Sequence, residues 1–107
     1  LARPDSQATP GKRLILFDDL IGAARSKEEA AEAFRSMGLV VTDCFVLFDY
    51  QQGGQQRLME RGIQLHAAIT REQLLNCFIL CGFISVRMAS QVDAYCQKLT
   101  QFLAEGE

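Results

Sequence analysis

The sequence has no excess of basic residues and no long apolar run. Its 107 residues include 11 Lys and Arg against 13 Asp and Glu, which gives a formal net charge of -2 and a pI near 5.4. Because no basic patch forms along the chain, the sequence argues against a nucleic-acid-binding protein. We also expect neither a signal peptide nor a membrane span. These absences predict a cytoplasmic protein that works away from nucleic acid and membrane surfaces.

Histidine is scarce, and the cysteines are widely spaced. A zinc site needs a closer CxxC-type pairing with further ligands, which the single His66 does not supply. Cys44 lies in an apolar segment, Cys77 and Cys81 are one helical turn apart in a hydrophobic run, and Cys96 lies in a late amphipathic segment. We expect buried, reduced thiols rather than a disulfide framework.

The composition is typical of one globular domain with a modest core. Hydrophobic residues make up 49% of the chain and charged residues 22%. Residues 1–12 predict a loop or linker, and residues 13–107 a single folded unit. The chain opens at Leu1 rather than at methionine and continues into a polar segment, so we expect a fragment or a processed chain.

The segment 13–26 organises the rest of the chain. Its apolar residues follow a Pro-Gly turn and predict a strand over 13–18, buried on both faces as in a parallel sheet. The strand ends in Asp18 and Asp19, and Ser26 with Glu29 forms a capping box that predicts the start of a helix. Ligands of open parallel sheets bind beyond the carboxyl ends of the strands, where we expect the two aspartates. Adjacent carboxylates can accept hydrogen bonds from a cis-diol and lie close to a magnesium ion.

A second strand, over 39–48, follows a helix predicted over 27–37 that ends at Gly38. The helix places Ala30, Phe34 and Met37 on its inner stripe, and we expect Lys27, Glu28, Glu32 and Arg35 on its solvated face. Strand, helix and strand over this span predict a right-handed crossover with parallel strands.

The second strand also ends in an acid, Asp49, so the sequences Leu-Phe-Asp at 16–18 and 47–49 predict carboxylates at the same edge of the sheet. The alternative is that aspartates at strand ends only form turns and caps.

Three further elements complete the prediction. A short helix over 55–61 stops at Gly62, and a third strand over 63–67 carries His66 at its end, where we favour a structural role for the imidazole. Thr70 and Gln73 predict a capped helix that runs to about Cys81. Ser85 or Ser90 then opens a last amphipathic helix, whose apolar face we expect in core or interface packing. That face comprises Met88, Val92, Tyr95, Leu99, Phe102 and Leu103.

Residues 14–26 resemble the phosphoribosyl pyrophosphate motif of type I phosphoribosyltransferases: four apolar residues, an acidic pair, two apolar residues and a small-residue loop. Residues 41–66 resemble the orotate phosphoribosyltransferases, especially the version fused into uridine monophosphate (UMP) synthase. The likeness lies in a strand ending in Leu-x-Asp, then Gln-Gly-Gly at 52–54, a helix, and Gly-Ile-x-Leu-His at 62–66. The resemblance covers nearly all of residues 10–105. It implies part of a Rossmann-like α/β fold, with a parallel sheet and flanking helices.

The resemblance also implies a function and a set of site residues. The family transfers ribose 5-phosphate from phosphoribosyl pyrophosphate to orotate in pyrimidine biosynthesis, assisted by magnesium. Asp18 and Asp19 would hold the ribose diol and lie close to the magnesium ion, while Tyr50 occupies the position of an arginine that helps to hold orotate. The loop around the 5-phosphate would comprise Gly22, Ala23, Ala24, Arg25 and Ser26.

This loop departs from the family pattern, because alanine and arginine replace hydroxyl and glycine residues. Arg25 could compensate for them with its charge or occupy the place of the phosphate. A phenol at Tyr50 can donate one hydrogen bond or stack on a pyrimidine, but it cannot pair ionically with a carboxylate.

Three hypotheses remain open from the sequence. The first, which the resemblance implies, is that residues 13–107 are the C-terminal half of an orotate phosphoribosyltransferase domain from a fused pyrimidine-synthesis enzyme. The family's first strands, pyrophosphate loop and lysine-bearing mobile loop would precede Leu14, so we expect this chain alone to be inactive and to form a homodimer or associate with a missing N-terminal half. The second hypothesis keeps the fold as a degenerate, non-catalytic module for ligand sensing or assembly. The third is a phosphoacceptor receiver domain, whose acidic pattern Asp18, Asp19 and Asp49 imitate, although the Lys expected at a later strand end is absent after Ile69.

Overall fold

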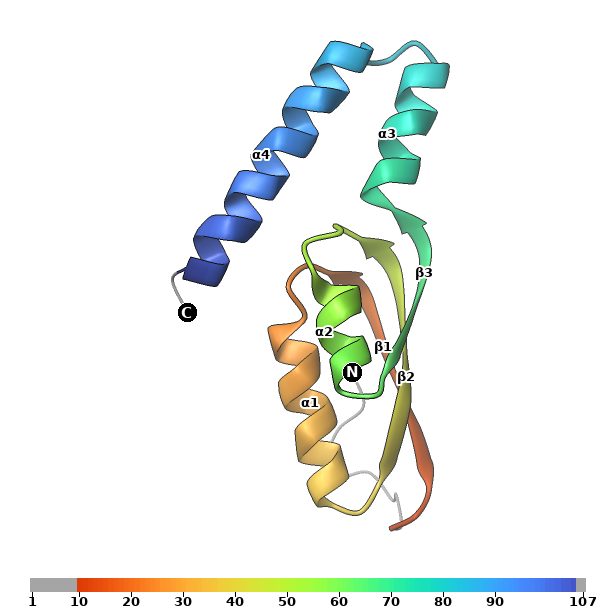
Figure 1. The fold of residues 1–107 in the computed structure, drawn as a ribbon. Coiled ribbons are helices and arrows are strands. Elements are labelled where there is room, and N and C mark those ends of the chain that lie inside the picture. The colour runs from red at the N-terminus through yellow and green to blue at the C-terminus, as the bar shows by residue number, and fades with distance from the viewer. Residues whose placement is uncertain (1–9, 106–107) are drawn as a thin grey trace.

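Three parallel strands in the order β1-β2-β3 form the centre of the computed structural model, which describes residues 10–105. In chain order the elements are β1 (Arg13–Ile21), α1 (Arg25–Ser36), β2 (Val40–Asp49), α2 (Gly54–Glu60), β3 (Gln64–Thr70), α3 (Arg71–Leu80) and α4 (Val86–Glu105). Most of the expected loop 1–12 lies outside the described residues. The parallel pairing of neighbouring strands is confirmed, and α1 and α2 cover the same face of the sheet (Figure 1).

The core lies between this face of the sheet and the two helices. Its fully buried side chains include Leu16, Ile21, Val41, Cys44, Leu58 and Ile63. The inner stripe of α1 differs from the prediction, because it comprises Lys27, Ala31 and Phe34, whereas Met37 is 40% exposed. The expectation that Lys27 lies on the solvated face is therefore wrong. Counting back from Phe34 in steps of three and four reaches Lys27, so helical phase rather than residue type decides its place.

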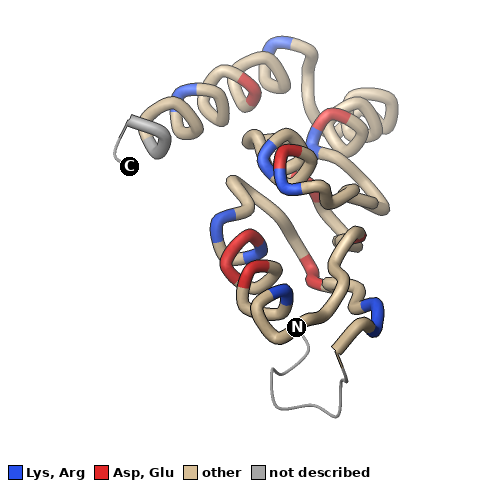
Figure 2. Tube along the Cα trace, turned by 60° about the horizontal axis from the view of Figure 1, so that its bottom comes forward, with Lys and Arg blue, Asp and Glu red and all other residues tan. Residues whose placement is uncertain are grey.

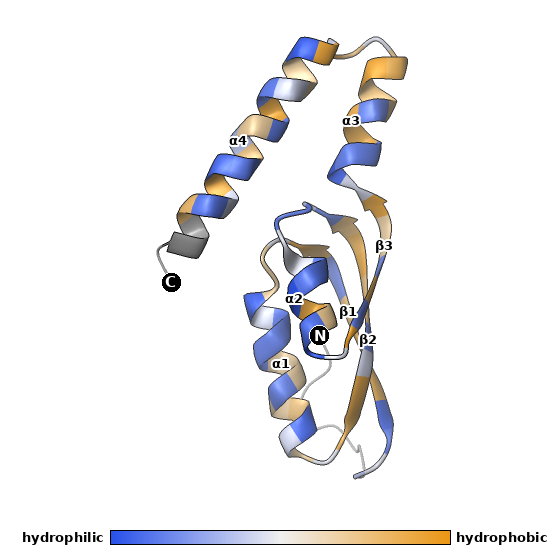
Figure 3. Ribbon diagram, viewed as in Figure 1, coloured by the Kyte–Doolittle hydropathy of each residue, from blue (hydrophilic) through white to orange (hydrophobic). Residues whose placement is uncertain are grey.

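The opposite face of the sheet has no helix packed on it in the described part of the chain. Ile15, Phe17, Phe45 and Leu47 on this face are 38–62% exposed. Figure 3 shows the apolar strands with helices on one side only. The expectation that the first strand is buried on both faces is therefore wrong, because the side chains of β1 alternate between the core and an uncovered surface, as those of β2 also do.

The helix starts test two predicted capping boxes. Thr70 and Gln73 form one at the start of α3, as expected. Ser26 and Glu29 do not, because α1 begins one residue earlier, at Arg25, and its N-cap is Ala24 without a side-chain cap. Ala24 has φ 71°, the left-handed region that alanine rarely adopts, so the turn before α1 carries backbone strain.

The last two helices form a hairpin that extends beyond the sheet (Figure 1). Ser85 opens α4, where its hydroxyl accepts the Met88 N–H. The apolar face of α4 does not belong to the core, because Met88, Val92, Tyr95 and Phe102 are 37–70% exposed. No helix in residues 10–105 combines the length and the apolar character needed to span a membrane.

The four cysteines are not equally buried. Cys44 is buried under α1, whereas Cys77 and Cys81 are exposed on α3 and Cys96 is half-buried. The expectation of buried thiols is therefore wrong for Cys77 and Cys81. The helix α3 is apolar around much of its circumference, and it contacts neighbours on only part of it.

Candidate functional site

The acidic pair lies inside β1 rather than beyond its end. The strand continues through Leu20 to Ile21, and Asp18 pairs in register with Val46 of β2. Asp49 pairs with Ile21, three residues further along the sheet, which at 3.3 Å per residue is about 10 Å from the level of Asp18. The expectation that these carboxylates meet at one edge is therefore wrong. The strands that carry them do lie side by side, as predicted.

Asp18 is held on both of its carboxylate oxygens. Oδ1 accepts the Asp19 N–H at 2.8 Å, and Oδ2 accepts a hydrogen bond from Lys27 Nζ at 3.2 Å. The Lys27 side chain is 4% exposed and that of Asp18 is 31% exposed. The Asp19 N–H lowers the pKa of Asp18, partial burial opposes this, and Lys27 lowers the pKa further. Sequence reasoning missed Lys27, which only the phase of α1 could have indicated.

Asp19 is the more open member of the pair. Its residue is exposed, and its Oδ1 accepts the Leu20 N–H at 2.9 Å. The two adjacent carboxylates are therefore unequal, since a buried cation pairs with Asp18 while Asp19 is exposed.

The turn 22–24 leads from β1 to α1 and packs against the start of α2. A Cβ placed on Gly54 would lie 2.6 Å from the Gly22 carbonyl oxygen, so the two backbones are in close contact. Arg57 donates to the Ala23 carbonyl at 3.4 Å. The structure thus brings Gly22, Ala23 and Ala24 together beside α2 at the end of β1.

Arg25 and Ser26 lie in the first turn of α1, next to a charged recess of about 180 Å³ between α1 and α2. Arg25, Glu28, Glu29, Glu32, Arg57 and Arg61 line this recess. Glu28 pairs with Arg57 at 2.9 Å and with Arg61 at 3.2 Å, which ties the two helices together. Figure 2 shows acidic and basic residues interspersed rather than gathered by sign. Arg25 therefore lines a recess in which three glutamates face three arginines.

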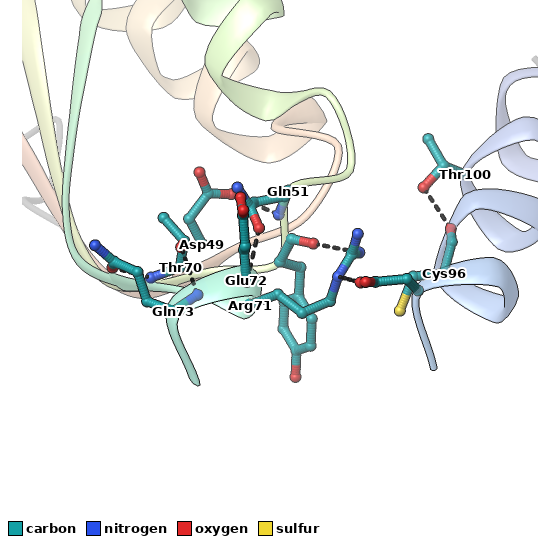
Figure 4. Close-up of polar contacts among 10 residues, drawn as sticks. Asp49, Gln51, Thr70, Arg71, Glu72, Gln73, Cys96 and Thr100 are labelled. Carbon is teal, nitrogen blue, oxygen red and sulfur yellow. Dashed lines mark hydrogen bonds and ion pairs between the residues drawn. The ribbon is translucent and has the colours of Figure 1, made fainter. Parts of the chain in front are cut away.

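At the far end of β2, Asp49 forms a turn. Its carboxylate is buried and accepts the Gln51 N–H at 2.8 Å, which is the alternative that the sequence left open for strand-end aspartates. Gln51 has φ 57°, and its side chain accepts the Glu72 N–H at the start of α3. Figure 4 shows these groups gathered where β2 and β3 end.

Tyr50 follows this turn, and Arg71 holds its backbone. The Tyr50 carbonyl accepts from Arg71 Nη1 at 2.7 Å, while Arg71 Nε pairs with Asp93 of α4 at 3.2 Å. The Tyr50 ring packs edge-on against Phe48 at 4.7 Å. Arg71 therefore connects the end of β2 to α4, a role that the sequence did not reveal because the partners are far apart along the chain.

Two hollows open near this end of the sheet. One of about 380 Å³ is lined by Asp49, Gln51, Gly53, Gln55, Gln56 and Met59. The other, of about 360 Å³, is lined by Gln51, Arg71, Glu72, Asn76, Asp93 and Gln97. Asp18 and Asp19 line neither hollow, so the acidic pair and these hollows are separate features.

His66 lies in the middle of β3 rather than at its end, which corrects the predicted position. Its Nε2 is 2.9 Å from Asp43 Oδ1, and its ring stacks on Phe45 with the centroids 4.4 Å apart. Hydrogen bonds from His66 and Thr42 lower the pKa of Asp43. These contacts fit the structural role that the sequence favoured.

The described residues contain no group of three or more His, Cys, Asp or Glu side chains that could hold a metal ion. Asp18 already pairs with Lys27, so the acidic pair offers few oxygens of its own to a cation. Magnesium commonly binds one or two carboxylates and completes its shell with waters and substrate phosphates. The pair fits an ion that arrives with a phosphorylated ligand better than one resident in the protein.

Known proteins match the chain in sequence and in fold. The UMP synthase of Bos taurus is 37% identical over 71 residues, which are 66% of this chain and 15% of that protein. The orotate phosphoribosyltransferase of Cenarchaeum symbiosum is 32% identical over 83 residues, 78% of this chain and 42% of that one. The chain is similar to part of an orotate phosphoribosyltransferase. No family model matches the sequence.

Solved structures agree with this similarity and confirm the type I phosphoribosyltransferase fold. The UMP synthase of Leishmania donovani superposes with a TM-score of 0.73 at 29% identity, covering 86% of this chain and 21% of that one. The orotate phosphoribosyltransferase of Aeropyrum pernix superposes with a TM-score of 0.62 at 28% identity, covering 64% of this chain and 42% of that one. The chain thus spans less than half the length of these relatives. Their names favour the transferase interpretation over a receiver domain.

Proposed function

We propose that this chain is an orotate phosphoribosyltransferase-like domain of UMP biosynthesis that binds the ribosyl donor. The observation that carries the proposal is an acidic pair in the first of two adjacent parallel strands, within a chain whose sequence and fold both resemble this family. Asp18 and Asp19 accept hydrogen bonds from the ribose 2- and 3-hydroxyls, for which two ordered carboxylates are suited. The reaction would transfer ribose 5-phosphate from phosphoribosyl pyrophosphate to orotate.

The turn after β1 is the proposed place of the 5-phosphate. Gly22, Ala23, Ala24 and Arg25 contribute backbone N–H groups, and Ser26 contributes the one hydroxyl of the loop. The base would lie near Tyr50, whose phenol can donate a hydrogen bond or stack on a pyrimidine. Arg71 lies beside Tyr50 and holds its carbonyl, so the position of this ring depends on a cation from α3.

We propose that magnesium enters with phosphoribosyl pyrophosphate. Its chemistry is to neutralise the pyrophosphate, and Asp19, with the outer edge of Asp18, would supply carboxylate oxygens to it. Direct binding of magnesium by this pair stays a prediction.

The uncovered sheet face implies a partner for complete activity. Ile15, Phe17 and Leu47 are exposed on it, and apolar surfaces of this kind mark interaction sites. We propose that a second copy of the chain, or the part of the domain that the relatives have and the match leaves out, packs on this face. A Phe17→Glu variant that stays folded but loses self-association in sedimentation would identify the surface. Unchanged association would place it elsewhere, with the exposed face of α4 next to be tested.

A non-catalytic module with the same fold is the second candidate. The loss of hydroxyls from the turn and the strained Ala24 favour it, because both weaken a phosphate cradle. Such a module would sense a ligand or support assembly without turning it over.

Calorimetry with phosphoribosyl pyrophosphate tests the proposal. The wild-type chain should bind it in magnesium chloride, and Asp19→Asn should weaken binding about tenfold by removing a charged acceptor. Glu60→Gln, at an exposed carboxylate in the last turn of α2, is the matched control and should leave binding unchanged. Binding without any effect of Asp19→Asn would place the donor elsewhere. No binding at all would leave the assembly module as the better account.

A further inference from the structure

Lys27 is a charged residue in an unfavourable place. It is one of two buried charged residues in the described part of the chain, the other being Asp49. It lies in the first turn of α1, where the helix dipole disfavours a cation. Burying an ammonium group is costly unless it is well paired, and within the described residues the Lys27 ammonium has one hydrogen-bond partner, Asp18 Oδ2. An apolar side chain would fill this core position at less cost, so stability does not explain Lys27.

The contact that Lys27 makes does have a consequence for the acidic pair. With Oδ1 bonded to the Asp19 N–H and Oδ2 to Lys27, the Asp18 carboxylate is fixed in one orientation. A carboxylate has about four lone-pair positions, so these two contacts leave acceptor capacity on its outer edge. The buried thiol of Cys44 on β2 also interacts electrostatically with Lys27 and Asp18, and burial raises the pKa of this thiol.

We propose that Lys27 is a positioning residue that orients Asp18 so that the acidic pair recognises both hydroxyls of the ribose. Lys27 acts through Asp18 and touches no ligand itself, because its side chain is enclosed by the core. The ordered pair selects a cis-diol over a sugar with a single hydroxyl, since both acceptors are set before the ligand arrives. The inference rests on the proposed function for the identity of its ligand.

A comparison of two sugar phosphates tests this role. Ribose 5-phosphate and 2-deoxyribose 5-phosphate differ by one hydroxyl of the diol, and calorimetry gives the ratio of their dissociation constants. The wild-type chain should prefer ribose 5-phosphate by roughly tenfold, the contribution of one hydrogen bond to a charged group. Lys27→Met should lower this preference toward one while binding of the deoxy sugar changes little. A purely structural role would weaken both sugars alike.

Three further variants test whether Lys27 acts through Asp18. Asp18→Asn should lose the same preference, and the double variant with Lys27→Met should lose no more than either single change, because both act through one contact. The double variant leaves no unpaired charge in the core, so it serves if Lys27→Met unfolds. Lys98→Met, the same substitution at an exposed lysine of α4, should keep the preference.

The outcomes separate the two proposals. A wild-type preference that persists in Lys27→Met and in the double variant overturns the role of Lys27 and leaves the proposed function intact. Failure of the wild-type chain to bind either sugar phosphate overturns both. Equal weakening of both sugars shows Lys27 to be structural only.

Discussion

Two neighbouring glycines at the start of α2 give a prediction in which the magnitudes follow from the structure. A Cβ on Gly54 would lie 2.6 Å from the Gly22 carbonyl oxygen and 2.8 Å from Ile21 Cδ1. Gly54→Ala therefore forces the turn 22–24 or the core to move. Overpacking of this kind costs about 1–3 kcal/mol. For a domain of this size that corresponds to a fall in melting temperature of roughly 5–20 °C.

Gly53 is the matched control, because its constraint is of another kind. It has φ +93°, and nothing lies within 4 Å of a Cβ placed on it. Gly53→Ala should therefore cost only backbone strain, about 1–2 kcal/mol, and leave the turn in place. Thermal unfolding followed by circular dichroism measures both costs.

The two variants should differ in binding as well as in stability. Gly54→Ala displaces the turn that we propose for the 5-phosphate, so it should weaken ribose 5-phosphate binding, whereas Gly53→Ala should not. The reasoning is refuted if Gly54→Ala is as stable as the wild type, or if the two variants change binding to the same extent.

Three further predictions concern a turn, a cap and a titration. Ala24→Gly removes left-handed strain of about 1–2 kcal/mol but loses a buried methyl group worth about 0.8 kcal/mol, so urea unfolding should show a net gain of several tenths of a kcal/mol. Thr70→Ala removes the capping box of α3 and should cost about 1 kcal/mol in the same assay, whereas Thr70→Ser should retain most of it. The pKa of Asp43 is lowered in the folded chain by hydrogen bonds from His66 and Thr42, so its contribution to stability is present above the unfolded pKa. That contribution is lost as the pH falls below about 4, and Asp43→Asn should flatten the acid side of the stability profile; an unchanged profile would contradict this.

Much of the fold follows from local patterns in the sequence. Apolar runs followed by helix-period segments predicted the parallel strands, and Gly38 and Gly62 predicted the helix ends, because their positive φ suits glycine. Thr70 and Gln73 predicted the start of α3, because the capping box that they form lies within four consecutive residues. Such features depend on neighbours along the chain, which the sequence displays directly.

The site was harder to predict, because it depends on strand register and helical phase. The polar residues Asp18 and Asp19 suggested the end of a strand, yet backbone pairing to β2 carries β1 on to Ile21. Residue type suggested a solvated Lys27, yet the phase of α1 turns it inward to Asp18. The apolar face of α4 was predicted from its helical spacing. An amphipathic pattern indicates that a face packs, but it does not identify the surface against which it packs.

The central claim is that the acidic pair and the turn after it bind a ribose phosphate. A nitrogen–proton correlation spectrum of the chain, recorded during titration with ribose 5-phosphate, tests it most directly. The account predicts saturable shifts of the backbone amides of residues 18–26, with smaller changes at the start of α2 where Gly54 contacts Gly22. Shifts confined to the hollows around Asp49 and Arg71, or no shifts at all, would contradict it.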